Sequence, residues 1–450
     1  MCCGACVSSG HLSTVHGSSA FSEASLGIAG QANQAFVRIA AQHLEKLILE
    51  GACERLHVCD RHRRHDRRWP GPSGRSEAEA SMTEASSDPT IAMRGAGYYS
   101  DHSINAKIVI DATLPLVEEA LRNVVQRSSD KPFAIADFGA ADGGTSLNLM
   151  RHVVQTLRGA GSHRAITLTY TDLPFNDFST LFRRLHGVLD VEDDAPLAQE
   201  PGLFIFASAT SFHRQIFPDE TLSLGFSASA MHWLSAKPGF IADHVHAVGA
   251  TETERAAYRE QARSDWSAIL LARARELMAG GRLVLANFCV DECGRYLGST
   301  AIANLLDTLA KHWRELASAN IITEDEYRAG TIQQFYRTID EFVAPFKDPD
   351  SPVSRAGLRL ESVSTMLTPC PFAARFRRRG DVTAFARAYV RHFRAWSQST
   401  FLSALNRNRP EVERAAIVDQ FYRAYETDVA AHPEAHWVDR VHCVQSIVKV

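Results

Sequence analysis

The sequence predicts an α/β fold in which a mostly parallel, Rossmann-like sheet carries helices on both faces. Two observations lead to this prediction. From Gly97 onward, short apolar runs typical of buried strands alternate with longer segments of helical spacing. The first such run, 133–138, leads through a glycine-rich turn at 139–144 directly into an amphipathic segment. This order of elements is typical of parallel strands joined by helices.

The predicted elements follow one another along the chain, and glycine or capping residues mark their ends. Thr145 or Ser146 is expected to start the first helix, and Gly159 to stop it. A long helix over about 252–278 is expected to stop at Gly280-Gly281. The strands are expected at 133–138, 165–171, 203–207, 222–226, 282–287, 358–367 and 441–448.

The 450 residues divide into two parts of different composition. Residues 1–92 are rich in Ser, Gly and Arg, and their single amphipathic segment, 32–49, cannot bury its apolar face alone. We therefore expect 1–92 to be a poorly ordered N-terminal extension, with Met93 as a candidate start. Residues 93–450 are expected to form one domain, with an α-helical cap inserted within about 298–357 because that stretch is helical in pattern and rich in aromatic residues.

Composition excludes several classes of protein. The chain has 48 Lys and Arg against 52 Asp and Glu, for a net charge of −4, so a dedicated nucleic-acid binder is not expected. No uninterrupted apolar run reaches the length of a membrane span, and no membrane partner is predicted. The nine cysteines are odd in number and scattered, unlike a secreted disulfide scaffold, which favours a cytoplasmic location.

The turn after the first strand lacks both common phosphate-binding patterns. Its glycines, at 139, 143 and 144, do not form G-x-G-x-x-G, and the chain has no G-x-x-x-x-G-K-[ST]. Asp137 closes the first strand and Asp172 the second, where an acidic residue can accept hydrogen bonds from both ribose hydroxyls of a nucleoside. This combination suits a nucleoside cofactor without a pyrophosphate, such as S-adenosylmethionine. The alternative is a purely structural turn with a capping Asp.

Five blocks of the sequence resemble, in order, the motifs of the SABATH family of S-adenosylmethionine-dependent carboxyl and N-methyltransferases. Residues 99–103 (YSDHS) resemble the opening Y-x-x-N-S, and 135–143 (IADFGAADG) resemble I-A-D-L-G-C-x-x-G. Residues 172–178 (DLPFNDF), 211–218 (SFHRQIFP) and 231–235 (MHWLS) resemble D-L-P-x-N-D-F, S-F-Y-x-x-L-F-P and L-H-W-L-S. The last three blocks are long and specific. The resemblance implies a class I methyltransferase sheet.

The resemblance also implies roles for matching positions, with S-adenosylmethionine as cofactor. Asp172 would hold the ribose, and Ser211 and Phe212 would lie near the adenine. The acceptor would lie beside His232 and Trp233, whose indole N–H could bond a carboxylate oxygen. The remaining implied cofactor positions are Tyr99, Ser103, Asp137, Gly139, Ala140, Thr145 and Leu173. Further acceptor positions are Ser229 and Ala106. Four residues, Phe335, Tyr336, Phe342 and Phe346, are candidates for an apolar wall around the acceptor, for which ordinary core packing is the alternative.

Several positions depart from the family pattern. Ala106 stands where carboxyl methyltransferases of the family carry a carboxylate-holding Gln, and Ser229 replaces a Tyr, which leaves room for a bulkier acceptor. Ala140 and Thr145 replace a Cys and an Asn. Some members place Mg²⁺ ligands in a D-x-F-N stretch, whereas 333–336 reads QQFY here. We therefore predict no Mg²⁺ site and no other metal.

The predicted activity is methyl transfer from S-adenosylmethionine to the carboxylate of a small organic acid by direct in-line displacement. A carboxylate is already ionised at neutral pH, so no general base, and hence no catalytic residue, is required. Two alternatives stay open: N-methylation of a small heterocycle, and a non-catalytic ligand-binding homologue. The oligomeric state is also open, with a homodimer as one option.

Overall fold

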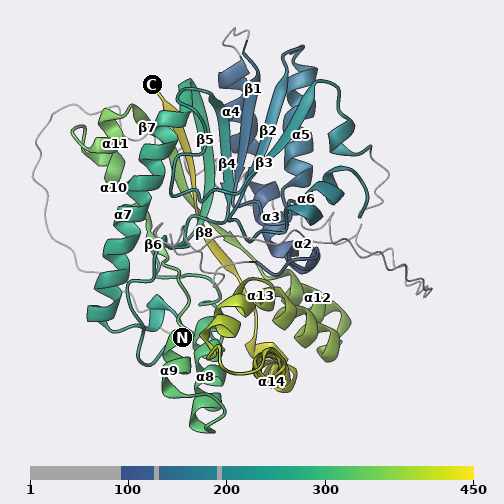
Figure 1. The fold of residues 1–450 in the computed structure, drawn as a ribbon, viewed down its shortest axis with the longest axis vertical. Coiled ribbons are helices and arrows are strands. Elements are labelled where there is room, and N and C mark those ends of the chain that lie inside the picture. The colour runs from purple at the N-terminus through teal and green to yellow at the C-terminus, as the bar shows by residue number, and fades with distance from the viewer. Residues whose placement is uncertain (1–92, 126–130, 190–194) are drawn as a thin grey trace, which may run out of the picture. The chain divides into compact units, whose positions relative to one another are not determined.

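The computed structural model describes residues 93–125, 131–189 and 195–450. The predicted extension, residues 1–92, lies outside the described residues. The described part is built on one sheet with the strand order β3-β2-β1-β4-β5-β8-β7, in which β8 runs antiparallel to both of its neighbours (Figure 1). The strands are β1 (Phe133–Phe138), β2 (Ile166–Thr171), β3 (Leu203–Ser208), β4 (Leu222–Ala228), β5 (Leu277–Val290), β7 (Leu358–Thr368) and β8 (Arg440–Lys449), with the short β6 (Arg337–Thr338) pairing with β5. The predicted α/β class is confirmed.

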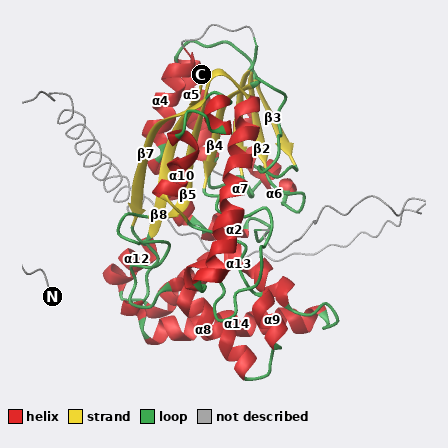
Figure 2. Cartoon of the chain, turned by 90° about the vertical axis from the view of Figure 1, so that its left-hand side faces the viewer, coloured by secondary structure: helices red, strands yellow, loops and turns green. Residues whose placement is uncertain are grey.

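Helices cover both faces of the sheet, as the alternation of apolar side chains requires. Ile135 and Val284 point to the face packed by α4 and α5, whereas Phe138 and Leu285 point to the face packed by α7 and α10. Figure 2 shows α7 and α10 in front of the sheet and α4 and α5 behind it. The helices on this sheet are α2 (Tyr98–His102), α3 (Ile104–Ala112), α4 (Leu114–Val125), α5 (Leu147–Gly159), α6 (Phe178–Leu185), α7 (Glu252–Glu276), α10 (Ile339–Lys347) and α11 (Pro352–Arg355).

A second layer is entirely helical and lies at one end of the sheet (Figures 1 and 2). Its helices come from two separate stretches: α8 (Leu305–Ser318) and α9 (Glu324–Ala329) precede β7, whereas α12 (Pro371–Arg379), α13 (Val382–Ala404) and α14 (Glu411–Ala431) lie between β7 and β8. Short 3₁₀ turns occur at η2 (Leu197–Gln199), η3 (Ala247–Gly249) and η4 (Pro433–Ala435). Helical periodicity over 371–431 is thus a feature that the sequence analysis did not assign.

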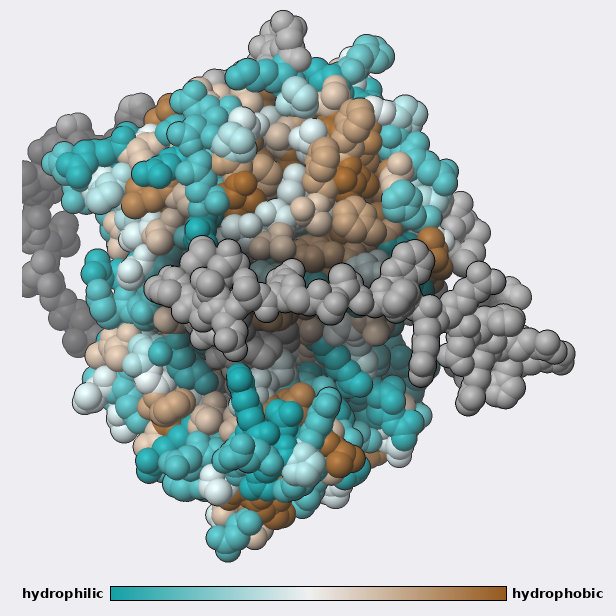
Figure 3. Space-filling view, viewed as in Figure 1, coloured by the Kyte–Doolittle hydropathy of each residue, from teal (hydrophilic) through white to brown (hydrophobic). Residues whose placement is uncertain are grey.

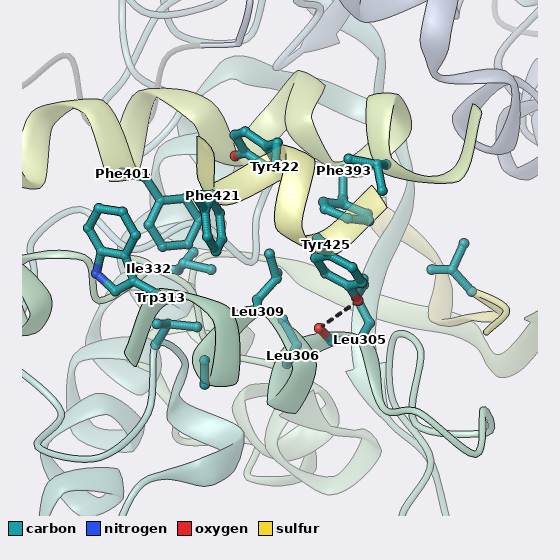
Figure 4. Close-up of a cluster of buried hydrophobic side chains, with 14 of the residues drawn as sticks. Leu305, Leu306, Leu309, Trp313, Ile332, Phe393, Phe401, Phe421, Tyr422 and Tyr425 are labelled. Atoms are coloured by element: carbon teal, nitrogen blue, oxygen red, sulfur yellow. Dashed lines mark hydrogen bonds between the residues drawn. The ribbon is translucent and has the colours of Figure 1, made fainter. Parts of the chain in front are cut away.

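Aromatic packing joins the two stretches of the helical layer. Trp313 of α8 lies 4.9 Å from Phe401 of α13 and 5.4 Å from Phe421 of α14, measured between ring centroids (Figure 4). The Tyr425 hydroxyl donates a hydrogen bond of 3.3 Å to the carbonyl oxygen of Leu305. These side chains are fully buried, so this layer has an aromatic core, and that core continues to Phe288 of β5.

The boundary between α7 and β5 differs from the predicted one. The helix ends at Glu276, and Gly280 and Gly281 lie inside β5 instead of stopping the helix. Glu276 is buried, pairs with Arg273 at 2.7 Å and accepts the backbone N–H of Ile216, which holds the chain at that point. Gly280 adopts a φ of 78°, and the pairing with β4 shifts register there, as expected for a glycine bulge. Helical periodicity through Met278 concealed this change.

Two surface features complete the description. Among the described helices, none is both long and apolar enough to cross a membrane. The edge strand β3 leaves Phe204 and Phe206 about half exposed. Figure 3 shows apolar residues gathered at the surface of the upper part of the view, which is the part that contains the sheet.

Candidate functional site

The parallel strands β1, β2, β4 and β5 all end at one edge of the sheet, and β8 begins there because it runs the opposite way. Ligands of open α/β sheets bind outside the carboxyl ends of the strands. Four of the five motif blocks follow strand ends or lie against them at this edge. The candidate site is therefore built from the segments after β1, β2, β3 and β4, the end of β5 and the start of β8.

The glycine-rich turn after β1 requires its first glycine. Gly139 adopts a φ of 76°, and a Cβ placed there would lie 2.3 Å from the Cβ of Ala230. The backbone N–H groups of Gly139 and Ala140 both donate to the carbonyl oxygen of Thr171, at 2.9 and 3.1 Å. The turn is thereby fixed against the end of β2 and against the loop after β4.

Asp172, directly after β2, keeps spare hydrogen-bonding capacity. Its Oδ2 accepts the N–H of Ala141 at 2.7 Å, and its Oδ1 accepts the N–H of Leu173 at 2.7 Å. A carboxylate oxygen has two lone pairs, so each oxygen can accept one further donor. Burial raises the pKa of Asp172 to about 6, against the effect of those two N–H donors.

Asp137, the fifth residue of β1, binds the residue that precedes the helix after the turn. Its Oδ2 accepts the hydroxyl of Ser146 at 2.6 Å, so Ser146 anchors the start of α5 through this carboxylate instead of capping the helix itself. Burial raises the pKa of Asp137 to about 7, and the nearby charge of Asp172 acts in the same direction. Two carboxyl groups with raised pKa values thus lie at adjacent strand ends.

The opening block is brought to this turn by polar contacts. Both the backbone N–H and the hydroxyl of Ser100 donate to the Asp142 carboxylate, and Arg184 of α6 pairs with Asp101 at 2.9 Å. Burial raises the pKa of Tyr99, and the charges of Arg440 on β8 and of Asp142 and Asp172 also act on it. Ser103 and Ala106 follow directly and are buried.

The other implied cofactor positions lie along the same edge. The Ser211 hydroxyl and His213 Nδ1 are 3.0 Å apart, and Phe212 lies within 4.0 Å of the position a Gly139 Cβ would take. Ala140 and Thr145 are buried in and after the glycine turn. Leu173 contributes its backbone N–H to Asp172.

His232 and Trp233 are positioned by a paired segment that the sequence analysis did not detect. Trp233 forms an antiparallel bridge with Gln334, and Phe335 N–H donates to the His232 carbonyl at 3.0 Å. Successive side chains of an extended segment point to opposite faces. Tyr336 accordingly lies 6.0 Å from His232 between ring centroids, whereas Phe335 packs on the other side with Leu234 and Tyr258.

The predicted acceptor residues are therefore only partly brought together. Phe346 packs against the sheet core with Phe342, on the α7 side, and not in the cluster that contains Trp233, Phe288 and Tyr336. Ser229 precedes Ala230 in the loop after β4 and is half-buried. Of the predicted wall residues, Tyr336 does lie beside His232, whereas Phe342 packs with Phe346. Two side chains that were not predicted complete the surroundings of His232: Phe288 of β5 at 4.8 Å, and His442 of β8, which stacks on Phe288 at 4.5 Å.

The imidazoles of this region are neutral at physiological pH. Burial lowers the pKa of His232 to about 3, assisted by the positive charges of Arg337 and Arg440. Burial also lowers the pKa of His246 and of His442 well below the usual range. His232 Nδ1 and both ring nitrogens of His442 are buried without a hydrogen-bond partner. The surroundings of His232 thus combine aromatic rings with unpartnered ring nitrogens, whereas the ends of β1 and β2 carry hydrogen-bonded carboxylates.

Comparison with known proteins shows which family has a sequence of this kind. Residues 90–353 match the family described as "SAM dependent carboxyl methyltransferase". The chain belongs to this family. It is similar to gibberellic acid methyltransferase 2 of Arabidopsis thaliana, 27% identical over 271 residues that cover 55% of this chain and 67% of the relative. It is also similar to loganic acid O-methyltransferase of Catharanthus roseus, 27% identical over 267 residues, covering 54% and 67%.

The fold agrees with that of a solved structure, a loganic acid methyltransferase with SAH. The TM-score is 0.61 at 21% identity, over 80% of this chain and 98% of the solved one. The predicted resemblance and the class I methyltransferase sheet are confirmed, and the chain is an S-adenosylmethionine-dependent carboxyl methyltransferase. Asp172 fits the cofactor's ribose because each carboxylate oxygen retains a lone pair beside two fixed backbone donors.

In the QQFY stretch of this carboxyl methyltransferase, both Gln side chains form hydrogen bonds within the protein. Gln333 Nε2 donates to the Leu234 carbonyl at 2.8 Å, and Gln334 Oε1 accepts the Tyr336 hydroxyl at 3.1 Å. Among the residues that the structure describes, no group of three or more His, Cys, Asp or Glu side chains is placed to hold a metal ion. The four described cysteines are free thiols.

Proposed function

We propose that this chain transfers the methyl group of S-adenosylmethionine to the carboxylate of a small organic acid at the edge formed by β1, β2, β5 and β8. One observation carries the choice of acceptor: His232, the imidazole beside the acceptor, has a pKa of about 3. Such a group is a poor base. A hydroxyl or a heterocyclic N–H needs a base to become nucleophilic, whereas a carboxylate is already ionised.

The bound cofactor supplies an activated methyl group on a sulfonium. In our proposal Asp172 holds the ribose through its spare lone pairs, and Ser211 and Phe212 lie against the adenine. Tyr99 of α2 and Ser103, which precedes α3, close the site, while the turn at Gly139, Ala140 and Thr145 and the backbone of Leu173 shape its floor. His232 and Trp233 orient the acceptor, and the surrounding aromatic rings exclude water. Positioning in a dry site is the main requirement for a displacement of this kind.

The helical layer extends this proposal. We propose that the helices from both stretches, 305–329 and 371–431, together act as the cap over the acceptor, because Trp233 and Phe288 belong to the same buried cluster as α8, α13 and α14. A bulky acceptor beside Ser229, a cytoplasmic location and a homodimer remain predictions, as does the separate N-terminal extension.

N-methylation of a heterocycle is the second candidate, and Ala106 favours it because the family's carboxylate-holding Gln is absent. The test is incubation with methyl-labelled cofactor and a panel of aromatic, fatty and isoprenoid acids alongside xanthine-type heterocycles, followed by mild base. We expect a base-labile, volatile methyl ester. A base-stable product would support N-methylation instead, and a protein that fails to bind labelled cofactor in calorimetry would overturn both.

A further inference from the structure

Arg440 differs from the other buried arginines of the described chain. Arg184, Arg273 and Arg282 each pair with a carboxylate, at 2.9, 2.7 and 2.6 Å respectively. Arg337 has no ion pair within 4.0 Å but donates to backbone carbonyls of Ala262 and Met231 at three positions. Arg440 is 5% exposed, and none of the ion pairs among the described residues includes it. A buried cation without a counterion is costly, so a protein rarely keeps one without a ligand for it.

Among the residues that the structure describes, the Arg440 guanidinium forms a hydrogen bond with one group, a neutral imidazole. Arg440 Nη2 lies 2.6 Å from His392 Nε2, and His392 Nδ1 lies 3.0 Å from the carbonyl oxygen of His102. A carbonyl only accepts, so Nδ1 carries the proton and Nε2 is the acceptor. Burial and the charge of Arg440 lower the pKa of His392 well below the usual range, in agreement with that tautomer. The positive charge of Arg440 is therefore not offset.

The acidic residue next to Arg440 in the sequence has other hydrogen-bond partners. Asp439, the residue before Arg440, accepts the N–H of Cys370 at 2.8 Å with Oδ1 and the hydroxyl of Thr300 at 2.8 Å with Oδ2. Arg440 Nε is buried without a hydrogen-bond partner. At least one donor of the guanidinium is thus available to a ligand.

The position of Arg440 links it to the acceptor region. It is the first residue of β8, at the edge where the parallel strands end, near the junction with the helical layer (Figure 1). Its guanidinium carbon lies 5.6 Å from the centroid of the Phe288 ring, which in turn packs edge-on against His232. Tyr99 and Tyr336, from the two sides of the site, both interact electrostatically with the Arg440 guanidinium.

We propose that Arg440 is the carboxylate-binding residue of the acceptor site, receiving one oxygen of the small organic acid while the other faces the methyl donor. This rests on the proposed function above. Arg440 would take the place of the family's carboxylate-holding Gln, which is absent at Ala106. The anion would then be bound by a cation from β8 and not by an amide from α3. An ionised acid paired with a guanidinium makes a stronger, shorter hydrogen bond than a neutral pair.

The test measures binding of benzoate, the small-acid probe, and of its uncharged isostere benzamide to the full chain saturated with S-adenosylhomocysteine. We expect the wild type to prefer benzoate. Arg440→Gln should weaken benzoate binding by roughly 10-fold to 100-fold and leave benzamide binding unchanged. Arg440→Lys should recover part of the preference because it keeps the charge. Arg282→Gln, which removes a buried arginine far from this edge, is the matched control and should behave as the wild type.

Two further readouts separate this role from others. If Arg440 merely supports the fold, Arg440→Gln should lower the thermal midpoint; we expect it to stay level or rise, since an unpaired buried charge is removed. Equal benzoate binding by the wild type and Arg440→Gln, or no preference of the wild type for benzoate over benzamide, would overturn the proposal. A loss of S-adenosylhomocysteine affinity in Arg440→Gln would assign Arg440 to the cofactor instead. Failure of the wild type to bind S-adenosylhomocysteine would count against the methyltransferase function itself.

Discussion

The two halves of the candidate site use opposite chemistry. The half at β1 and β2 is acidic and internally bonded, with Asp137 and Asp172 each held by defined donors. The half at β5 and β8 is aromatic and cationic, with His232, His442 and Arg440 leaving buried nitrogen atoms unpartnered. A fixed set of acceptors suits a cofactor rich in hydroxyl and ammonium donors, whereas a region of unmet donors suits an anion. Both halves depart from the family pattern in places: Ala140 and Thr145 in the first half, and Ser229 in the second.

The largest effect is expected from a substitution that disturbs both halves of the site, Gly139→Val. Gly139→Val would place a side chain 2.3 Å from the Cβ of Ala230 and force a β-branched residue into a φ of 76°. We expect loss of cofactor binding and of methyl transfer by at least about 100-fold, because moving Ala230 also displaces His232. Calorimetry with S-adenosylhomocysteine and a labelled-methyl assay measure this.

Gly159→Ala is the control, because nothing lies within 4 Å of a Cβ there and the residue has no positive φ. It should keep wild-type affinity and activity. If Gly139→Val retained both as well, the close approach between the turn and the loop after β4 would not matter for the site.

The contrast between the halves also explains which features were predictable. The strands around Asp137 and Asp172 were recognised because apolar runs bounded by glycine and aspartate are local signals. The ends of β1 and β2 agree with the expectation to within a residue. Local patterns likewise identified the blocks that carry the family resemblance. Strand ends and motif blocks, which depend on residues close together in the sequence, could thus be predicted well.

The acceptor half depends on contacts between distant segments, and periodicity carries no information about those. Arg440 reaches the site because β8 inserts antiparallel between β5 and β7. Tyr336 reaches it because its segment pairs with Trp233, about a hundred residues earlier. The one local clue was the alternation Phe335-Tyr336, which would place these two rings on opposite faces if the segment were extended.

The next prediction separates the halves. Asp172→Ala removes the acceptors proposed for the ribose and leaves β8 untouched. We expect cofactor affinity to fall by roughly 1.5–3 kcal/mol for each charged hydrogen bond lost, about 10-fold or more. Titration with S-adenosylhomocysteine measures the loss. Unchanged affinity would remove Asp172 from the cofactor site.

A smaller effect is expected from pH. Because burial raises the pKa of Asp172 to about 6, its carboxylate is protonated below that value and becomes a weaker acceptor. Cofactor affinity should therefore rise as pH increases from 5 to 7 and then level off, by up to about tenfold per pH unit below the pKa. Asp137, with a pKa raised to about 7, contributes a second step in the same direction.

The variants Asp172→Asn and Asp137→Asn show which carboxylate causes each step in the pH dependence of cofactor affinity. Each should remove its own step while leaving the other, as measured by calorimetry in a series of buffers of equal ionic strength. A pH profile that both variants leave unchanged would mean that neither carboxylate titrates at the cofactor.

The smallest predicted effect tests the acceptor half at a single atom. Trp233→Phe keeps an aromatic ring but removes the indole N–H that we expect to bond the acceptor carboxylate. Loss of one hydrogen bond to a carboxylate costs about 1.5 kcal/mol at the lower end of the range, so KM for the acid should rise about tenfold while cofactor affinity stays constant. Trp313→Phe is the matched comparison, because its indole N–H donates to the Tyr327 carbonyl at 3.1 Å inside the helical layer. That change should lower stability and leave KM unchanged, so a rise in KM from Trp313→Phe alone would reverse the roles assigned to the two indoles.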